Sequence, residues 1–275
     1  MSRSKIADQM IKYLEKKINC ENIIKHINEN KNHPKEDKLI INEIAVAFEI
    51  IQYDDDPEYD KEKIRESDNP DYDNDKKKLS EKDVDKIFAV YDFMTEANYT
   101  GFEYFPYLYG VLNCHEGSNS RVYTFYESFD GNLINLIQKI DHPSEWYDIA
   151  FQIIMINYYI QIVNAYSYNN GEPQNHLYKK LAKPYYKLYQ IDGIEFNINH
   201  KYLLVIWNIT HIKKITDKMR ISSNISLLLE YLEKNTPKIP PSSRIINLFN
   251  NIKSNPENTL TILKEYYPIS ASKNI

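Results

Sequence analysis

The chain has 275 residues, of which 42% are hydrophobic, 13% aromatic and 27% charged, and its formal net charge is −5 at pH 7. This composition is typical of a core-forming globular protein and excludes wholly disordered, collagen-like and disulfide-scaffold classes. The length fits one two-lobed domain or two small ones. Only six glycines are present, none of them in the first 100 residues, and no two are close enough to form a glycine-rich, phosphate-binding loop.

Cysteine content and hydropathy limit the cellular compartments in which the protein is expected. Cys20 and Cys114 are too few for a disulfide framework, and the start MSRSKIADQM lacks the apolar stretch of a secretory signal. We therefore expect a reduced, intracellular protein. The most apolar stretch, 153–165, contains three side-chain amides and is shorter than the roughly 20 residues that cross a bilayer. It is expected to form a buried helix.

The negative charge is concentrated in the segment 54–75. This segment has eleven acids and three basic residues, about −8, which leaves the rest of the chain near +3. Its few apolar residues predict a solvated loop or a disordered insertion. The aspartates do not predict a calcium loop, because the central glycine and the closing glutamate are missing. No pairs of cysteine and histidine have the spacing of a structural zinc site.

The first hundred residues predict helices. Apolar residues recur at helical spacing over 5–31, and the stronger apolar run at 39–53 is also interpreted as a helix. After the acidic segment, Ser80 and Asp83 resemble a capping box, and an apolar face continues from there to Met94.

From Phe105 onward, β-branched and aromatic residues predict an antiparallel hairpin, followed by alternating helices, loops and strands. Together with the N-terminal helices, this pattern predicts an α+β fold whose C-terminal half is mostly helical. The expected elements are strands at 105–114 and 121–129, helices at 132–140 and 144–166, a polar loop at 168–175, a strand at 201–207, and three short helices at 225–234, 244–253 and 259–267.

The segment 177–190, LYKKLAKPYYKLYQ, combines basic and aromatic residues. Lys179, Lys180, Lys183 and Lys187 alternate with tyrosines and a proline, a composition that suits phosphate contacts and base stacking in a nucleic-acid partner. The alternative interpretation is a long exposed hairpin that joins the strands on either side.

The order of elements from about 105 to 215 resembles the hinge and catalytic-loop region of the eukaryotic-type protein kinase fold, in the divergent form of large DNA viruses. The expected hairpin corresponds to the fourth and fifth strands and the hinge. The loop YNNGEPQN, 168–175, lies where the catalytic loop H-x-D-x-x-x-x-N belongs, and WNIT, 207–210, lies where D-F-G belongs. The resemblance implies a two-lobed fold with three parts: a helical N-terminal region at 1–104, a remnant hairpin and hinge at 105–130, and a C-lobe at 131–275.

The resemblance also implies that the catalytic residues are lost. Tyr168 replaces the histidine and Asn170 replaces the catalytic aspartate, while Asn208 replaces the metal-binding aspartate. Asn175 keeps the position of the metal-ligand asparagine. An amide is not a base at neutral pH and carries no charge to hold magnesium, so we expect no phosphoryl transfer and no resident cofactor or metal. The cleft positions that would face a nucleotide are Glu127, Phe129, Asn175 and Asn208.

The phosphate-binding half is also expected to be absent. The family has a glycine-rich loop before its third strand and a nucleotide-anchoring lysine on that strand. Lys76, Lys77 or Lys78, with Asp85 as the facing acid, would have to take these roles, although the surrounding sequence is typical of a charged helix entry. The resemblance therefore implies a pseudokinase with a reduced, helix-rich N-terminal lobe.

Three functions follow from this interpretation. The first is a non-enzymatic scaffold or regulatory binding module of viral origin, which binds a protein partner in the host cytoplasm or within the virion. The second is a weakly active Ser/Thr kinase, in which Asn175, Asn208 and an acid such as Glu172 or Asp192 hold magnesium and ATP. The third is a structural virion component that docks through the segment 5–53.

Overall fold

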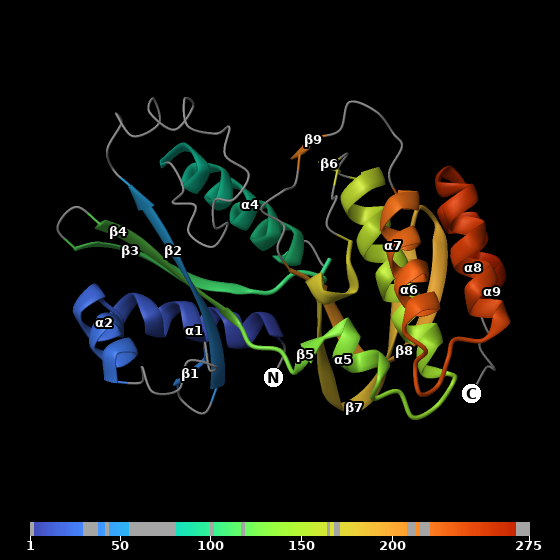
Figure 1. Cartoon of the computed structure of the whole chain (residues 1–275), viewed down its shortest axis with the longest axis horizontal. Coiled ribbons are helices and arrows are strands. Elements are labelled where there is room, and N and C mark those ends of the chain that lie inside the picture. Colours follow the sequence, from blue (N-terminus) through green and yellow to red (C-terminus); the bar gives the residue numbers. More distant parts are fainter. Residues whose placement is uncertain are drawn as a thin grey trace. The chain divides into compact units, whose positions relative to one another are not determined.

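The computed structural model describes residues 3–29, 38–41, 44–54, 81–99, 102–116, 119–163, 166–167, 171–207, 213–214 and 221–267. The chain divides into two compact units, Met1–Ser128 and Phe129–Ile275 (Figure 1). Each unit combines helices with antiparallel strands. The predicted mixture of helix and antiparallel sheet is therefore confirmed.

The first unit is a four-stranded antiparallel sheet with helices on both faces (Figure 1). The strand order is β1-β2-β4-β3, and α1 and α2 lie on one side of the sheet while α4 lies on the other (Figure 1). The elements are α1 (Arg3–Lys17), α2 (Cys20–Glu29), β1 (Lys38–Ile41), β2 (Ile44–Asp54), α4 (Glu81–Tyr99), β3 (Leu108–Glu116) and β4 (Asn119–Glu127).

Alternate residues of β4 are buried on opposite faces of this sheet. Tyr123 and Phe125 belong to the hydrophobic cluster that the apolar side of α1 forms with the sheet. Val122 and Thr124 alternate with them along the strand and are also fully buried. The α1 residues in this cluster are Ala7, Met10 and Leu14, and the sheet residues in it include Val46, Tyr109 and Cys114. A sheet that is covered on both faces has no solvent-facing row of polar residues.

The helix expected at 39–53 is wrong, because the described residues of this segment form β1 and β2. A strand that is covered on both faces has a continuous apolar run, and periodicity alone does not distinguish such a run from a buried helix. The region 1–104 is therefore not entirely helical, and the unit is built on a sheet rather than being reduced and helix-rich. The helices expected at 5–31 and after Ser80 are confirmed as α1, α2 and α4.

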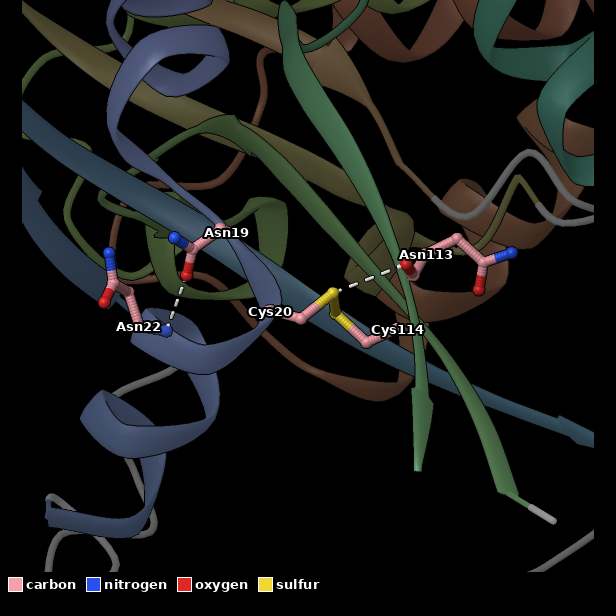
Figure 2. The surroundings of a disulfide bond; sticks show 5 residues. All are labelled: Asn19, Cys20, Asn22, Asn113 and Cys114. Carbon is pink, nitrogen blue, oxygen red and sulfur yellow. Dashed lines mark hydrogen bonds between the residues drawn. A yellow bond between two sulfur atoms is a disulfide. The ribbon is translucent and has the colours of Figure 1, made fainter. Parts of the chain in front are cut away.

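The expectation of two reduced cysteines is also corrected. Cys20, the first residue of α2, forms a disulfide with Cys114 of β3, with their Cα atoms 5.5 Å apart (Figure 2). The Cys20 sulfur also lies 3.4 Å from the carbonyl oxygen of Asn113. Asn19 fixes the start of α2, because its side-chain oxygen accepts a hydrogen bond from the backbone N–H of Asn22 at 2.9 Å (Figure 2). The helix start therefore places one cysteine directly on β3.

The second unit packs helices against a long β-hairpin. Its sheets are the three-stranded β5-β7-β8 and the two-stranded β6-β9. The helix α6 is buried almost throughout and continues into a π-helical turn, Tyr159–Val163. The elements are β5 (Gly131–Asn132), α5 (Leu133–Ile137), α6 (Glu145–Tyr158), β6 (Tyr166–Ser167), β7 (His176–Ile191), β8 (Ile194–Ile206), β9 (Lys213–Lys214), α7 (Ile221–Lys234), α8 (Ser243–Ser254) and α9 (Thr259–Tyr266).

Local sequence signals account for most of these boundaries. Asn132 and Asn135 form a reciprocal capping box at the start of α5, and Ser242 accepts a hydrogen bond from the Ile245 N–H at the start of α8. The predicted hairpin, the short and long helices, and the three C-terminal helices are confirmed. The strand predicted at 201–207 begins earlier, at Ile194, and pairs with β7. In the part of the chain that the structure describes, no helix is long and apolar enough to cross a membrane.

Candidate functional site

The two segments that the kinase resemblance aligns with the catalytic loop and D-F-G are joined at both of their ends. On one side, β6 pairs with β9, with Tyr166 opposite Lys214 and Ser167 opposite Lys213. On the other side, the backbone N–H of Trp207 donates to the carbonyl oxygen of Asn175 at 2.7 Å. The described residues at the two ends of these segments are therefore paired with each other. Tyr168, Asn170 and Asn208 lie outside the described residues.

Asn175 ends a short 3-10 turn, Pro173–Asn175, and is buried. Its backbone N–H donates to the carbonyl oxygen of Glu172 at 2.9 Å. The Glu172 carboxylate accepts a hydrogen bond from the side chain of Gln174. Glu172 therefore lies in the same turn as Asn175, as the weakly active kinase would need.

Asp192, the other acid considered for magnesium, lies at the opposite end of the β7–β8 hairpin from Asn175. It lies in the turn at the far end of the β7–β8 hairpin, at a φ of 48°, and its carboxylate accepts a hydrogen bond from the Tyr158 hydroxyl at 3.0 Å. Asn175 lies immediately before the other end of β7. Among the residues that the structure describes, no group of three or more His, Cys, Asp or Glu side chains is arranged to hold a metal ion.

Side-chain amides of α7 and α6 pack next to Gly171, which lies before β7. A Cβ atom at Gly171 would lie 2.2 Å from Cγ of Asn224 in α7, so only glycine fits this position. The Asn224 amide donates to Oδ1 of Asn157 in α6 at 2.7 Å, and the Asn157 amide donates to the Ile153 carbonyl at 2.8 Å. Gly171 is therefore explained by close packing of the loop against two helices.

His176, the first residue of β7, is fully buried and neutral. Its Nδ1–H donates to the carbonyl oxygen of Glu172 at 3.2 Å, and Nε2 has no hydrogen-bond partner. Burial lowers the pKa of His176 to about 4, although the hydrogen bond to Glu172 opposes this effect. Protonation of His176 would therefore place a buried positive charge, with no opposite charge paired to it, at the start of β7.

We expect His176 to make the second unit less stable in weak acid. Because the pKa of His176 is about 4 in the folded state and near 6.5 in the unfolded state, the unfolded chain binds more protons between these values. The free energy of unfolding should therefore fall by about 2 kcal/mol for this group between pH 7 and pH 5. Denaturant titrations at both pH values measure this change.

The matched variant is His176→Asn, whose amide nitrogen takes the place of Nδ1 and does not titrate. The loss of stability between pH 7 and pH 5 should be smaller in the variant by the same amount. Equal losses in the two proteins would contradict the assignment to His176.

Glu127 and Phe129, two of the predicted cleft positions, have structural partners. Nε and Nη2 of Arg3 donate to the buried Glu127 carboxylate at 3.1 and 2.6 Å. Burial alone would lower the pKa of Arg3, but the Glu127 carboxylate raises it, and the pair anchors the start of α1 to the end of β4. Phe129 belongs to the second unit and packs against Leu203 and Val205 of β8.

Sequence reasoning missed a polar ladder between α6 and β8. Asp148 Oδ2 accepts hydrogen bonds from the backbone N–H groups of Lys201 and Tyr202 at 2.8 and 3.2 Å. One turn later, Gln152 accepts from the Leu204 N–H at 2.8 Å and donates to the Tyr202 carbonyl at 3.0 Å. These side chains satisfy the backbone of β8 along its edge.

Glu145, one turn before Asp148, completes the ladder. It accepts hydrogen bonds from the Lys201 ammonium at 2.5 Å and the Tyr202 hydroxyl at 2.6 Å. Burial raises the pKa of Glu145, but these hydrogen bonds outweigh that effect and lower it. The available signal was the spacing of Glu145, Asp148 and Gln152, which fall on one face of a mostly apolar helix.

The ladder extends through His200 to the opposite strand. His200 Nδ1–H donates to Asp148 Oδ1 at 2.7 Å, and Nε2 faces the hydroxyl of Tyr189 in β7 at 2.6 Å. Tyr189 and Phe196 also pack against Phe151 of α6. The hairpin is thus fixed to α6 by a buried chain of hydrogen bonds and by aromatic contacts.

Comparison with known proteins identifies a viral relative. No family model matches the chain. A protein of Acanthamoeba polyphaga mimivirus described as "Uncharacterized protein R691" is 44% identical over 278 residues, which cover 97% of this chain and 99% of the mimivirus protein. The two chains therefore align over essentially their whole lengths. This finding supports the viral origin that the resemblance implied.

Proposed function

This chain belongs to the family of the mimivirus protein R691, and we propose that it is a pseudokinase of a large DNA virus. It acts as a scaffold or regulatory binding module in the host cytoplasm or within the virion. The observation that carries the proposal is the joining of the loop after β6 to the segment after β8, through the β6–β9 pair and the hydrogen bond between Trp207 and Asn175. A kinase needs this juxtaposition to bring its catalytic loop and D-F-G to one place.

The order of elements in the first unit supports the same interpretation. If β3 and β4 are the fourth and fifth strands of the kinase resemblance, then β2 takes the place of the third strand. The helix α4 follows β2 and precedes β3, as the helix that carries the acid partner of the lysine does in kinases. Lys76, Lys77 and Lys78 follow β2 in the chain rather than belonging to it, and they lie outside the described residues.

The sequence of β2 supports the loss of nucleotide binding. Residues 46–49 of β2 are V-A-F-E, where the third strand of kinases has V-A-I-K. In the proposed alignment Glu49, which pairs with Thr124 in the sheet, corresponds to the nucleotide-anchoring lysine. A carboxylate repels the phosphates that a lysine attracts. Asn170 and Asn208 replace two charged groups of the kinase reaction, and Glu49 replaces a third.

Restoring the two aspartates should not restore activity. The variant Asn170→Asp with Asn208→Asp regains the general base and the metal ligand, but it still lacks the lysine that holds the phosphates. We expect no phosphoryl transfer above background from the wild type or from this variant. The measurement is transfer of labelled phosphate from ATP to a generic protein substrate and to the chain itself, in the presence of magnesium.

Thermal denaturation with ATP and magnesium separates the proposal from the weakly active kinase. A ligand that binds only the folded state raises the melting temperature, so the pseudokinase should show no metal-dependent shift. The triple variant, which adds Glu49→Lys to Asn170→Asp and Asn208→Asp, is the matched control for nucleotide binding. Magnesium-dependent stabilisation of the wild type by ATP, or phosphoryl transfer by the double variant, would contradict the proposal.

A further inference from the structure

The far half of the β7–β8 hairpin exposes large apolar side chains. Tyr186 is 72% exposed, Leu188 is 62% exposed and Tyr185 is 42% exposed. Only Tyr99 and Val111 are comparable among the residues whose burial the structure describes, and both belong to the first unit. Three of the five exposed large apolar residues are thus found within four positions of one strand. Exposed clusters of this kind mark binding surfaces more often than isolated residues do.

The strand pairing places Tyr186 and Leu188 on the outer face of the hairpin. Tyr185 and Tyr189, on alternate positions, have their rings against His200 on the inner face. Side chains two positions apart share a face, so Tyr186 and Leu188 lie on the opposite one. The residues directly across from them on β8 are Asn199 and Asn197, which are both exposed. The outer face is therefore a row of one aromatic ring, one aliphatic side chain and two amides.

The charge of this strand is positive although the chain as a whole is acidic. Residues 177–191 contain Lys179, Lys180, Lys183 and Lys187 and no acid. Lys180 and Lys183 are exposed, and they lie at the irregular register between Lys180 and Tyr185, which contains Pro184. Proline has no N–H group and is accommodated at such irregularities. Lys180 and Lys183 thus lie in or at the edge of the irregular segment that precedes Tyr186, whereas the Lys187 ammonium lies 5.0 Å from the ring centre of Tyr189.

The outer face is held on a fixed support. The hydrogen bonds from Tyr189 through His200 to Asp148 fasten both strands to α6. The turn at the far end is fastened separately, by the Tyr158 hydroxyl donating to Asp192. Because side chains on a fixed ladder lose little freedom on binding, an exposed ring here is suited to stacking.

We propose that the outer face of the β7–β8 hairpin, formed by Tyr186, Leu188, Asn197 and Asn199 with Lys180 and Lys183 at its margin, binds single-stranded nucleic acid. Single strands offer bases that stack on an exposed ring and phosphates that pair with lysines. Side-chain amides hydrogen-bond to the edges of unpaired bases. Residues 177–191 add no acid to this surface, and the Asp130 carboxylate beside it accepts a hydrogen bond from the backbone N–H of Lys180 at 2.7 Å. This inference does not depend on the kinase resemblance.

Fluorescence anisotropy of the full chain with labelled oligouridine and oligothymidine of about 20 nucleotides tests the proposal, since single-strand sites commonly span about 4–16 nucleotides. We expect binding that weakens linearly with the logarithm of salt concentration, with a slope of about −0.7 for each phosphate contact. Tyr186→Leu should weaken binding roughly tenfold, because it removes a stacking ring and keeps an apolar side chain. Tyr186→Phe should bind like the wild type.

Lys183→Glu should weaken binding and reduce the salt slope, whereas Lys253→Glu on the exposed surface of α8 makes the same charge change and should not. Preference for the ribo- or deoxyribo-oligomer identifies the natural strand, and either result supports the proposal. No binding at roughly 10⁻⁴ M in low salt would overturn it. Equal binding by wild type and Tyr186→Leu, or equal competition by polyglutamate, would overturn it in favour of an acidic protein partner.

Discussion

Replacing Asp148 by asparagine is expected to lower the free energy of unfolding of the second unit by about 3 kcal/mol, because a buried donor left without its acceptor costs about 1–3 kcal/mol. The carboxylate is buried and accepts hydrogen bonds from His200, Gln152 and the backbone N–H groups of Lys201 and Tyr202. All four partners are donors. An asparagine has one acceptor oxygen, so its NH₂ group would point at two of these donors.

Tryptophan fluorescence during chemical denaturation measures this effect, because both tryptophans of the chain, Trp146 and Trp207, belong to the second unit. Asp141→Asn is the matched control, since Asp141 is exposed just before α6 and its nearest cation, Lys238, is 3.9 Å away. The control should change stability by less than about 0.5 kcal/mol. If Asp148→Asn were as stable as this control, the ladder would not hold the hairpin to α6.

The polar ladder between α6 and β8 was not predicted from the sequence. The spacing of Glu145, Asp148 and Gln152 on α6 is visible in the sequence, but their partners are backbone groups of β8 about fifty residues later. Pattern analysis places polar residues on a helix face and does not identify which strand edge they satisfy. The same separation hid His200, whose partners come from α6 and β7.

Local signals predicted most of the helices well. The apolar periodicity of α1, α6 and α8 is a short-range feature, because it depends on residues within a few turns of one another. The hairpin of β3 and β4 was also found, since a polar turn separates two β-branched and aromatic runs. The strand β2 was missed because its apolar run lacks the alternation that identifies a half-buried strand.

The candidate site residues stay a prediction. The kinase resemblance implied that the loop ending at Asn175 lies near the end of β8, and a backbone hydrogen bond joins Asn175 to Trp207. The ion pair between Glu127 and Arg3 could not be predicted from the sequence, because the two residues are 124 positions apart and no local pattern links them. Glycine at 171 has a packing cause in Asn224, which composition alone does not reveal.

Reducing the disulfide between Cys20 and Cys114, or replacing both residues by serine, is expected to destabilise the first unit by about 2–4 kcal/mol. The bond closes a loop between residues 94 positions apart, and chain entropy assigns about 4.7 kcal/mol to a loop of about 100 residues. The bond also ties α2 to β3, in the sheet on which α1 packs. Freeing α2 should therefore increase opening of this helix before the sheet unfolds.

Peptide-resolved hydrogen exchange with and without reductant locates the effect. Protection should fall most in α2, then in α1 and β3, and remain unchanged in α7 and α8, which belong to the second unit. The Cys20→Ser/Cys114→Ser protein is the control, because reductant should not change its exchange further. Identical protection of α2 in oxidised and reduced wild type would mean that packing alone holds the helix, since the sulfur bridge would then add nothing to the contacts of Ile23 in the core.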